Sequence, residues 1–118
     1  MLHVISYRGP YTLTLKAVEW LRDESWPGVF VLGESSRESG SFHVEYVGRS
    51  DTNLADRISE WIGTHPEFMF AFTETPWQAF LEECHIFHHL HPSGNQSHPV
   101  ASLYRGWQCP DCSDRIWA

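Results

Sequence analysis

Residues 46–57 read Tyr-Val-Gly-Arg-Ser-Asp-Thr-Asn-Leu-Ala-Asp-Arg, and this stretch decides how we interpret the rest of the chain. A segment typical of a strand leads into Gly48, a polar turn follows, and helical spacing then begins. Ser50, Asp51 and Thr52 could each accept a hydrogen bond from the free N–H groups of that helix start. The stretch therefore predicts a strand that turns directly into a helix.

The same stretch carries a phenol and a guanidinium that we expect to lie close together. Tyr46 stands at the end of the expected strand, and Arg57 stands about one and a half turns into the expected helix. Arginine binds phosphate through a planar fork of N–H donors, and a hydroxyl group can supply a further hydrogen bond. The two side chains are therefore candidates for holding a phosphate.

The composition is typical of one small folded domain. The chain has 118 residues, of which 42% are hydrophobic, so it can bury a core. No apolar run reaches about 18 residues, so we expect no membrane span. The first residues are too few and too polar for a signal peptide, and three Cys fit a reducing compartment. We therefore expect a cytoplasmic protein.

The charge balance restricts nucleic-acid binding. The chain has 15 acidic and 8 basic residues, a formal net charge of −7. Proteins that bind nucleic acid usually gain affinity from Lys and Arg on the phosphates. Arg49 and Arg37 are candidate nucleic-acid contacts, and with Arg57 they would form a local basic patch. The total charge argues against tight non-specific binding by this domain alone.

Hydrophobic periodicity predicts a small α+β sandwich with three antiparallel strands and helices packed on them. The expected strands are Gly28–Gly33, Phe42–Val47 and Phe68–Thr73, with a polar loop at Glu34–Ser41 between the first two. One helix is expected over residues 52–62, with Leu54 and Ile58 in its apolar stripe. A second, which runs to about Leu90, starts at Thr75-Pro76 with Gln78 in the capping-box position.

The two ends are interpreted as additions to this core. In the N-terminal part we expect a short strand at Leu2–Ser6, ended by Gly9-Pro10, and a helix at Leu13–Asp23 capped by Thr12 or Thr14. The chain is accordingly divided into an N-terminal extension (1–26), a central domain (27–95) and a C-terminal tail (96–118).

The central domain resembles the GIY-YIG nuclease superfamily over residues 27–95. The order of strands and helices agrees with that family. The matching motifs are Gly28-Val29-Phe30 and Tyr46-Val47-Gly48 for the two halves of the signature, Arg57 for the helix arginine, Glu83 for the second-helix glutamate, and Asn95 for the terminal asparagine.

The resemblance implies a metal-dependent endonuclease that hydrolyses phosphodiester bonds, with DNA as the expected substrate. Glu83 would hold one Mg²⁺ or Mn²⁺ ion, and Arg57 would contact the phosphate. Tyr46 would position or deprotonate the attacking water, or bind the phosphate. Asn95 would orient the site by hydrogen bonds.

Two positions differ from the family pattern. Phe30 stands where the family has its first tyrosine, and Trp61 stands where it often has His or Tyr. Because Phe has no proton to transfer, Tyr46 or a neighbour such as His43 would have to replace that function. The alternative is a catalytically weak or inactive module that binds nucleic acid or a protein partner, and such a partner could supply the missing basic surface.

The candidate residues also have structural interpretations. Phe30 and Tyr46 could be ordinary strand aromatics, and Glu83 with Glu82 could lie on a solvated helix face. Arg57 could pair with Asp56 or Glu60 on the helix surface. Asn95 lies in a Ser-Gly-Asn turn, where it fits ordinary loop chemistry equally well.

The C-terminal tail contains a pattern typical of zinc binding. Cys109-Pro-Asp-Cys112 has the two-residue spacing that lets both thiolates reach one ion. Cys84 and His88, four residues apart on one helix, are the expected further ligands. The alternatives are an inert cysteine pair and Cys84 as a small buried hydrophobe. The competing donors are His85, His89, His91 and His98.

Overall fold

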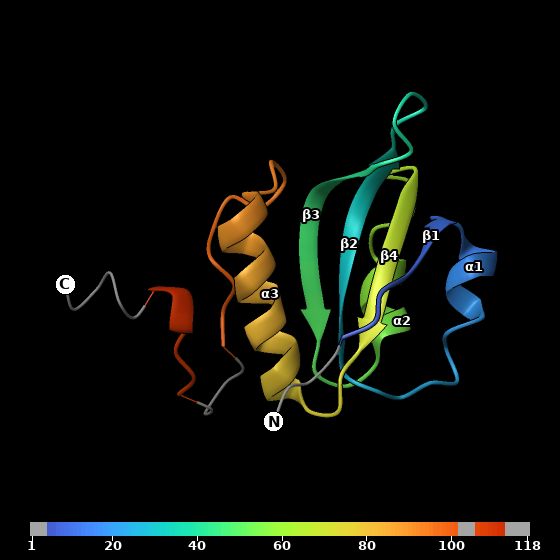
Figure 1. Ribbon diagram of the computed structural model, residues 1–118. Helices are drawn as coiled ribbons and strands as arrows, with labels where there is room; N and C mark the ends of the chain where they lie inside the picture. The colour runs from blue at the N-terminus through green and yellow to red at the C-terminus, as the bar shows by residue number, and fades with distance from the viewer. Residues whose placement is uncertain (1–4, 102–105, 113–118) are drawn as a thin grey trace.

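A computed structural model describes residues 5–101 and 106–112 of the protein. These residues form an α+β fold with one sheet and helices on both of its faces (Figure 1). In chain order the elements are β1 (Arg8–Thr12), α1 (Leu15–Glu19), β2 (Gly28–Ser35), β3 (Phe42–Ser50), α2 (Leu54–Ser59), β4 (Glu67–Phe72) and α3 (Pro76–Leu90).

The sheet has four antiparallel strands in the order β1-β4-β2-β3. The three expected strands are present, with β2 between β3 and β4. The expectation of a three-stranded sheet is wrong, because β1 from the N-terminal part pairs with β4 and adds a fourth strand. As a result β3 is one edge of the sheet and β1 is the other.

The position of β1 corrects the expected strand at Leu2–Ser6, whose first residues lie outside the described part of the chain. The strand begins at Arg8 and continues through Gly9 and Pro10 instead of ending there. Proline is tolerated on an edge strand because its missing N–H faces no neighbour. The register shifts between Arg8 and Tyr11, and Gly9 adopts φ +113°, as in a β-bulge.

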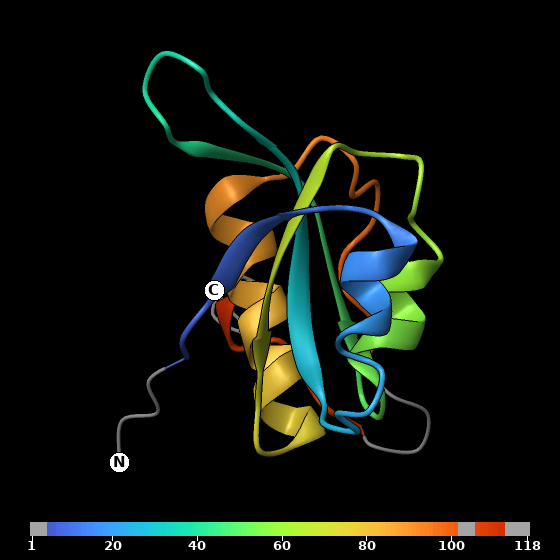
Figure 2. The same ribbon diagram turned by 90° about the vertical axis from the view of Figure 1, so that its right-hand side faces the viewer.

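The two faces of β2 explain its continuous apolar sequence. Phe30 and Leu32 pack with α1 and α2 on one face, whereas Val29 and Val31 lie on the other face, which α3 covers. Figures 1 and 2 show the sheet between these two layers. Because both faces are covered, the first six residues of β2 are all buried.

The start of α3 is confirmed in detail. Thr75 is its N-cap, Pro76 is its first residue, and the Thr75 and Gln78 side chains form a capping box. The apolar side of α3 packs against β2 and β3. This orientation turns Glu83 toward the sheet.

The other two helices are shorter than expected. The predicted helix over residues 52–62 is α2, which ends at Ser59, and its N-cap is Asn53 instead of Ser50, Asp51 or Thr52. The Ser50 hydroxyl accepts hydrogen bonds from the N–H groups of Thr52 and Asn53, so it closes the turn before the helix.

The first helix is capped by Thr14, one of the two expected residues, but covers only Leu15–Glu19 of the expected Leu13–Asp23. The Leu13 N–H instead bonds to the Pro66 carbonyl. Within the described residues, no helix has both the length and the apolar character needed to cross a membrane.

Candidate functional site

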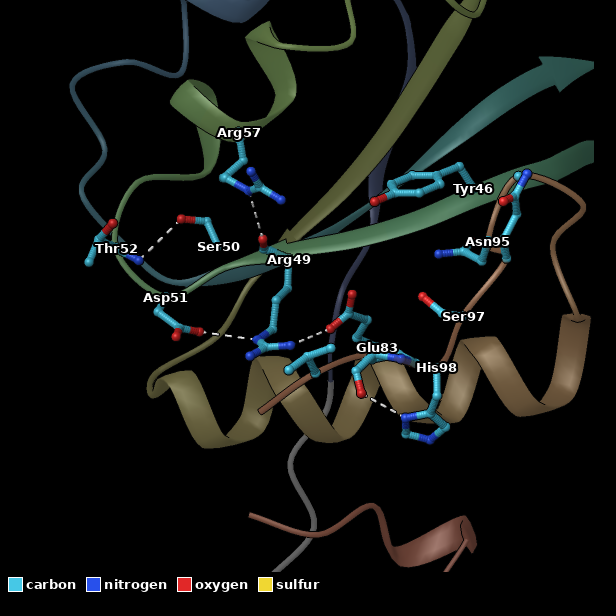
Figure 3. A pocket seen from close by; sticks show the side chains of 14 residues that line it. Tyr46, Arg49, Ser50, Asp51, Thr52, Arg57, Glu83, Asn95, Ser97 and His98 are labelled. Carbon is cyan, nitrogen blue, oxygen red and sulfur yellow. Dashed lines mark hydrogen bonds and ion pairs between the residues drawn. The ribbon is translucent and has the colours of Figure 1, made fainter. Parts of the chain in front are cut away.

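A cavity of about 620 Å³ lies along the free edge of β3 (Figure 3). Its walls come from β3, the turn that follows, α2, α3, and residues 94–100, which we call the wall segment. The lining residues are Tyr46, Arg49, Ser50, Asp51, Thr52, Arg57, Glu83 and the wall segment.

Four of the five candidate catalytic residues share this cavity. Tyr46 comes from β3, Arg57 from α2, Glu83 from α3, and Asn95 from the wall segment. The side chains of Tyr46, Arg57 and Glu83 are drawn around the same space in Figure 3. The convergence of three separate elements is what the resemblance implied for these residues.

Phe30, the fifth candidate, does not line the cavity. Its ring is fully buried in the core that faces α1 and α2. A Cβ at Gly48 would lie only 2.5 Å from the Phe30 Cζ atom, so the ring fills the space that this glycine leaves. Phe30 therefore acts as a core residue beneath the site.

Glu83 is a buried carboxylate held by an arginine. Arg49 Nη1 donates a hydrogen bond to Glu83 Oε1 at 2.6 Å, and the side chains are 11% and 10% exposed. Burial raises the pKa of Glu83, while the hydrogen bond and charge of Arg49 act in the opposite direction. The net shift of the pKa is upward.

Arg49 contacts two carboxylates and an aromatic ring. Besides Glu83, it donates from Nε to Asp51 Oδ1 at 3.2 Å, and its guanidinium lies 5.0 Å from the centre of the Phe80 ring. Arg49 was a candidate nucleic-acid contact. The structure places it in the cavity, where its charge is shared between two carboxylates.

The Tyr46 side chain is held by ring packing, and its hydroxyl keeps the proton that it could donate in a hydrogen bond. The Tyr46 and Trp61 rings lie 4.2 Å apart between centroids, which holds the phenol in place. Burial is the largest cause that raises the pKa of Tyr46; the Glu83 charge adds to it, and Arg57 opposes it. A phenol with a raised pKa keeps its proton at neutral pH, which suits positioning of water or phosphate better than proton abstraction.

Arg57 lines the cavity and also makes a surface ion pair. Its Nη1 contacts Glu60 Oε1 at 3.1 Å, and its Nε donates to the Arg49 carbonyl at 3.4 Å. The side chain is 44% exposed, and ion pairs at such positions are weak. A phosphate could therefore compete with Glu60 for this guanidinium.

Asn95 binds the backbone of the edge strand. Its Oδ1 accepts from the Val47 N–H at 2.8 Å, and its Nδ2 donates to the Val47 carbonyl at 2.9 Å. The Gly94 N–H donates to the Glu45 carbonyl at 2.6 Å. Asn95 thus replaces part of a neighbouring strand and anchors the wall segment to β3.

Arg37 and His43 lie away from the cavity. Both line a separate small pocket at the β2–β3 hairpin, whose loop projects beyond the body of the sheet (Figures 1 and 2). Because His43 does not line the cavity, it is not placed to take over the function missing at Phe30.

A group of His and Cys side chains adjoins the wall segment, to which His98 belongs. One ligand atom from each of four residues lies within 4.8 Å of the others, so the group could bind a metal such as zinc. We call it the His/Cys group. Its members are His88, His98, Cys109 and Cys112.

The membership of this group corrects the expected ligand set. His88, Cys109 and Cys112 belong to it, but His98 takes the place expected for Cys84. Cys84 is fully buried in an apolar cluster with Phe80, and burial raises the pKa of its thiol. Helical spacing places Cys84 and His88 on one side of α3 without bringing their ligand atoms to one point.

Two features of the site were missed from the sequence. The Arg49–Glu83 pair depends on which face of β3 carries Arg49. Strand alternation puts Arg49 on the same face as Val47, which α3 covers, so the strand pattern contains a signal for this contact. The position of His98 depends on the path of a loop, for which the sequence offers no comparable signal.

Comparison with protein-family models, curated proteins and solved structures gives no match. The resemblance to GIY-YIG nucleases stays a prediction.

Proposed function

We propose that this protein is a metal-dependent phosphodiester hydrolase that cleaves nucleic acid, with DNA as the expected substrate. The single observation that supports this most is that Tyr46, Arg57 and Glu83 line one cavity although they come from three elements. A carboxylate, a guanidinium and a phenol can serve a metal ion, a phosphate and a water molecule, respectively.

Glu83 is the residue proposed to hold the catalytic ion. Arg49 occupies its Oε1 atom, whereas Oε2 has no hydrogen-bond partner among the described residues and is left as the ligand oxygen. Mg²⁺ and Mn²⁺ accept a single carboxylate together with several waters. When bound, such an ion supplies an activated water and stabilises the negative charge that develops on the phosphate.

Arg57 and Tyr46 are proposed to act on the substrate. Arg57 would exchange Glu60 for a phosphate oxygen and stabilise the additional charge of the transition state. Tyr46 would donate its hydroxyl proton in a hydrogen bond to the phosphate or orient the attacking water. The water oxygen would bond to phosphorus and release its proton to solvent, the ester oxygen would leave and take up a proton from solvent, and the strand would be cut.

A second candidate function is a module that binds nucleic acid or a protein partner without cutting. The Arg49–Glu83 contact of 2.6 Å favours it, because a positive group already neutralises the carboxylate that a metal would need. The buried Phe30 and the net charge of −7 point the same way. A protein partner would then supply the basic surface.

Two kinds of ion are proposed, at separate places. Carboxylate and water ligands suit Mg²⁺ or Mn²⁺, whereas thiolates and imidazoles suit Zn²⁺. The catalytic ion is therefore assigned to Glu83, and a structural zinc ion to the His/Cys group.

The test is a cleavage and binding assay with supercoiled plasmid and labelled DNA and RNA, in EDTA, Mg²⁺ or Mn²⁺. We expect cleavage by the wild type only with Mg²⁺ or Mn²⁺, and loss of cleavage in Glu83→Gln, which can still accept from Arg49. Glu82→Gln is the matched control, because Glu82 contacts Tyr7 and does not line the cavity. Binding without cleavage under every metal would favour the second candidate, and neither binding nor cleavage would contradict both.

A further inference from the structure

We propose that one Zn²⁺ ion bound by His88, His98, Cys109 and Cys112 holds the wall segment in place and so completes the cavity. The link is His98, which belongs to the His/Cys group and also lines the cavity. This inference concerns metal binding and local order, and it does not depend on whether the protein cleaves nucleic acid.

The distances within the group are close to those of a tetrahedral zinc site. The Nε2 atoms of His88 and His98 are 3.1 Å apart, and Cys112 Sγ is 3.0 Å from His88 Nε2. With zinc bonds of about 2.0 Å to nitrogen and about 2.3 Å to sulfur, tetrahedral neighbours are roughly 3.3–3.8 Å apart. The remaining ligand-atom pairs lie within 4.8 Å, so movements of up to about 1 Å would accommodate the ion.

The hydrogen bonds of His98 prepare it as a ligand. Its Nδ1 lies 2.7 Å from the Pro99 carbonyl, which can only accept, so Nδ1 carries the proton. In the neutral ring the lone pair is then on Nε2, which faces His88 and the rest of the group. Zinc-bound histidines commonly donate their second N–H to a carbonyl in this way.

The surroundings also favour a bound cation. His88 lies in the last turn of the 15-residue helix α3, where the helix dipole is negative. Cys109 is buried in an apolar cluster with Phe80 and Cys84, which limits the access of water to the sulfur. Cys112 is brought close to Cys109 by a turn in which its N–H bonds to the Cys109 carbonyl at 3.2 Å.

The wall segment has an anchor near each of its two ends. At one end, Gly94 and Asn95 bond to the edge of β3. Beyond them, residues 96–101 make no backbone–backbone hydrogen bond with the described part of the chain. His98 is the second anchor: its ring packs against Phe87 and His88 of α3, and a shared zinc ion would add a bond to this contact.

The first test is the zinc content of the purified full chain, measured by mass spectrometry. We expect about one zinc per chain in the wild type, and loss of most of it in His98→Asn and Cys112→Ser. The Asn amide can still donate to the Pro99 carbonyl, so His98→Asn removes the ligand and keeps the local hydrogen bond. Cobalt substituted into the wild type should give the absorption of a tetrahedral site with thiolate ligands, a readout that needs no variant.

Two control variants separate this ligand set from its neighbours. Cys84→Ala removes the expected ligand that the structure places outside the group, although its thiol bonds to Cys109, and His85→Ala removes a member of the neighbouring set His85, His89 and Asp111. Both controls should keep the zinc. Zinc absent from the wild type, kept in His98→Asn, or lost in Cys84→Ala would overturn the assignment.

The second test is amide hydrogen exchange of the wild type before and after removal of zinc by a chelator. We expect the Val47 and Gly94 amides to exchange at least about tenfold faster without zinc, because the wall segment loses one anchor. The amides of β2 should stay protected. Unchanged exchange at Val47 and Gly94 after the metal has left would overturn the proposed link to the cavity.

Discussion

The cavity and the His/Cys group meet at His98, and their polar groups are arranged in different ways. In the cavity, each of the charged residues already contacts one of opposite sign, as Arg49 does with Glu83 and Arg57 does with Glu60. The His/Cys group instead consists of four electron-pair donors whose ligand atoms lie within 4.8 Å of one another. A ligand that binds in the cavity must therefore displace an existing ion pair, whereas the His/Cys group offers several donors that a metal could share.

Exchange explains how a domain of charge −7 could still accept a phosphate. A metal cation would replace Arg49 at part of Glu83, and a phosphate anion would replace Glu60 at Arg57. When both arrive together, the local charge changes little, so neither exchange leaves a buried charge uncompensated. On this account, metal and phosphate bind the cavity cooperatively.

The largest expected effect is on cleavage when Arg57 is replaced by Ala. Removal of a group that stabilises the transition-state charge typically lowers the rate by about 10²–10³. We expect a loss of that order, measured as the plasmid-nicking rate in Mn²⁺. Arg37→Ala removes an arginine at the distant hairpin and should leave the rate unchanged. Equal losses in both variants would mean that only the total positive charge matters.

The next effect is on stability when Arg49 is replaced by Met. The buried Glu83 would lose its partner, and breaking such a pair costs about 3–5 kcal/mol. We expect the free energy of unfolding, measured with urea, to fall by an amount of this order. Adding Glu83→Gln to Arg49→Met should restore part of the loss. A change below about 0.5 kcal/mol would show that the ion pair is exposed to solvent in solution.

A smaller effect is expected for Asn95→Ala. The variant loses both hydrogen bonds to Val47, with a cost of about 1–2 kcal/mol, and the loss should be local to the edge of β3. Hydrogen exchange at the Val47 amide should become faster. Asn95→Asp sharpens the test, because it retains an acceptor for the Val47 N–H but cannot donate to the carbonyl. If Asn95→Asp behaved like the wild type, the backbone role of Asn95 would be wrong.

The smallest effect concerns pH. Burial raises the pKa of Glu83 above its ordinary value of 4.5, so the folded protein holds this proton more tightly than the unfolded chain. The contribution of Glu83 to stability is fully present below that ordinary value and is lost as the pH rises through the raised pKa. Without added Mg²⁺ or Mn²⁺, the wild type should therefore lose stability relative to Glu83→Gln as the pH rises. A relative gain measured by urea unfolding would contradict the direction of the shift.

Strands and helices were predicted correctly where their apolar pattern or capping residues lie within the element itself. Continuous apolar runs identified β2 and β4, and the Thr75-Pro76 start with Gln78 identified α3. The failure at β1 has a physical cause: Gly9-Pro10 usually ends a strand, but it is tolerated on an edge that pairs with distant β4. The number of strands in the sheet depended on that long-range pairing.

The residues of the site also fall into those that sequence motifs predict and those that depend on long-range packing. The resemblance identified Tyr46, Arg57 and Glu83, and these residues do line one cavity. The partners of these residues depend on the rotation of α3 against β3, which no motif specifies. Likewise, the Cys-Pro-Asp-Cys spacing pointed to a metal group, but His98 enters it through the fold of the loop after α3.

The most direct test of the account is the location of a Mn²⁺ ion in the zinc-loaded protein, measured by paramagnetic broadening of backbone amide signals. We predict that broadening centres on Glu83, Cys84, Arg49 and Asp51, spares the hairpin at Arg37, and disappears in Glu83→Gln. Broadening centred on another part of the chain, or retained in Glu83→Gln, would contradict the proposal that this carboxylate holds the catalytic ion.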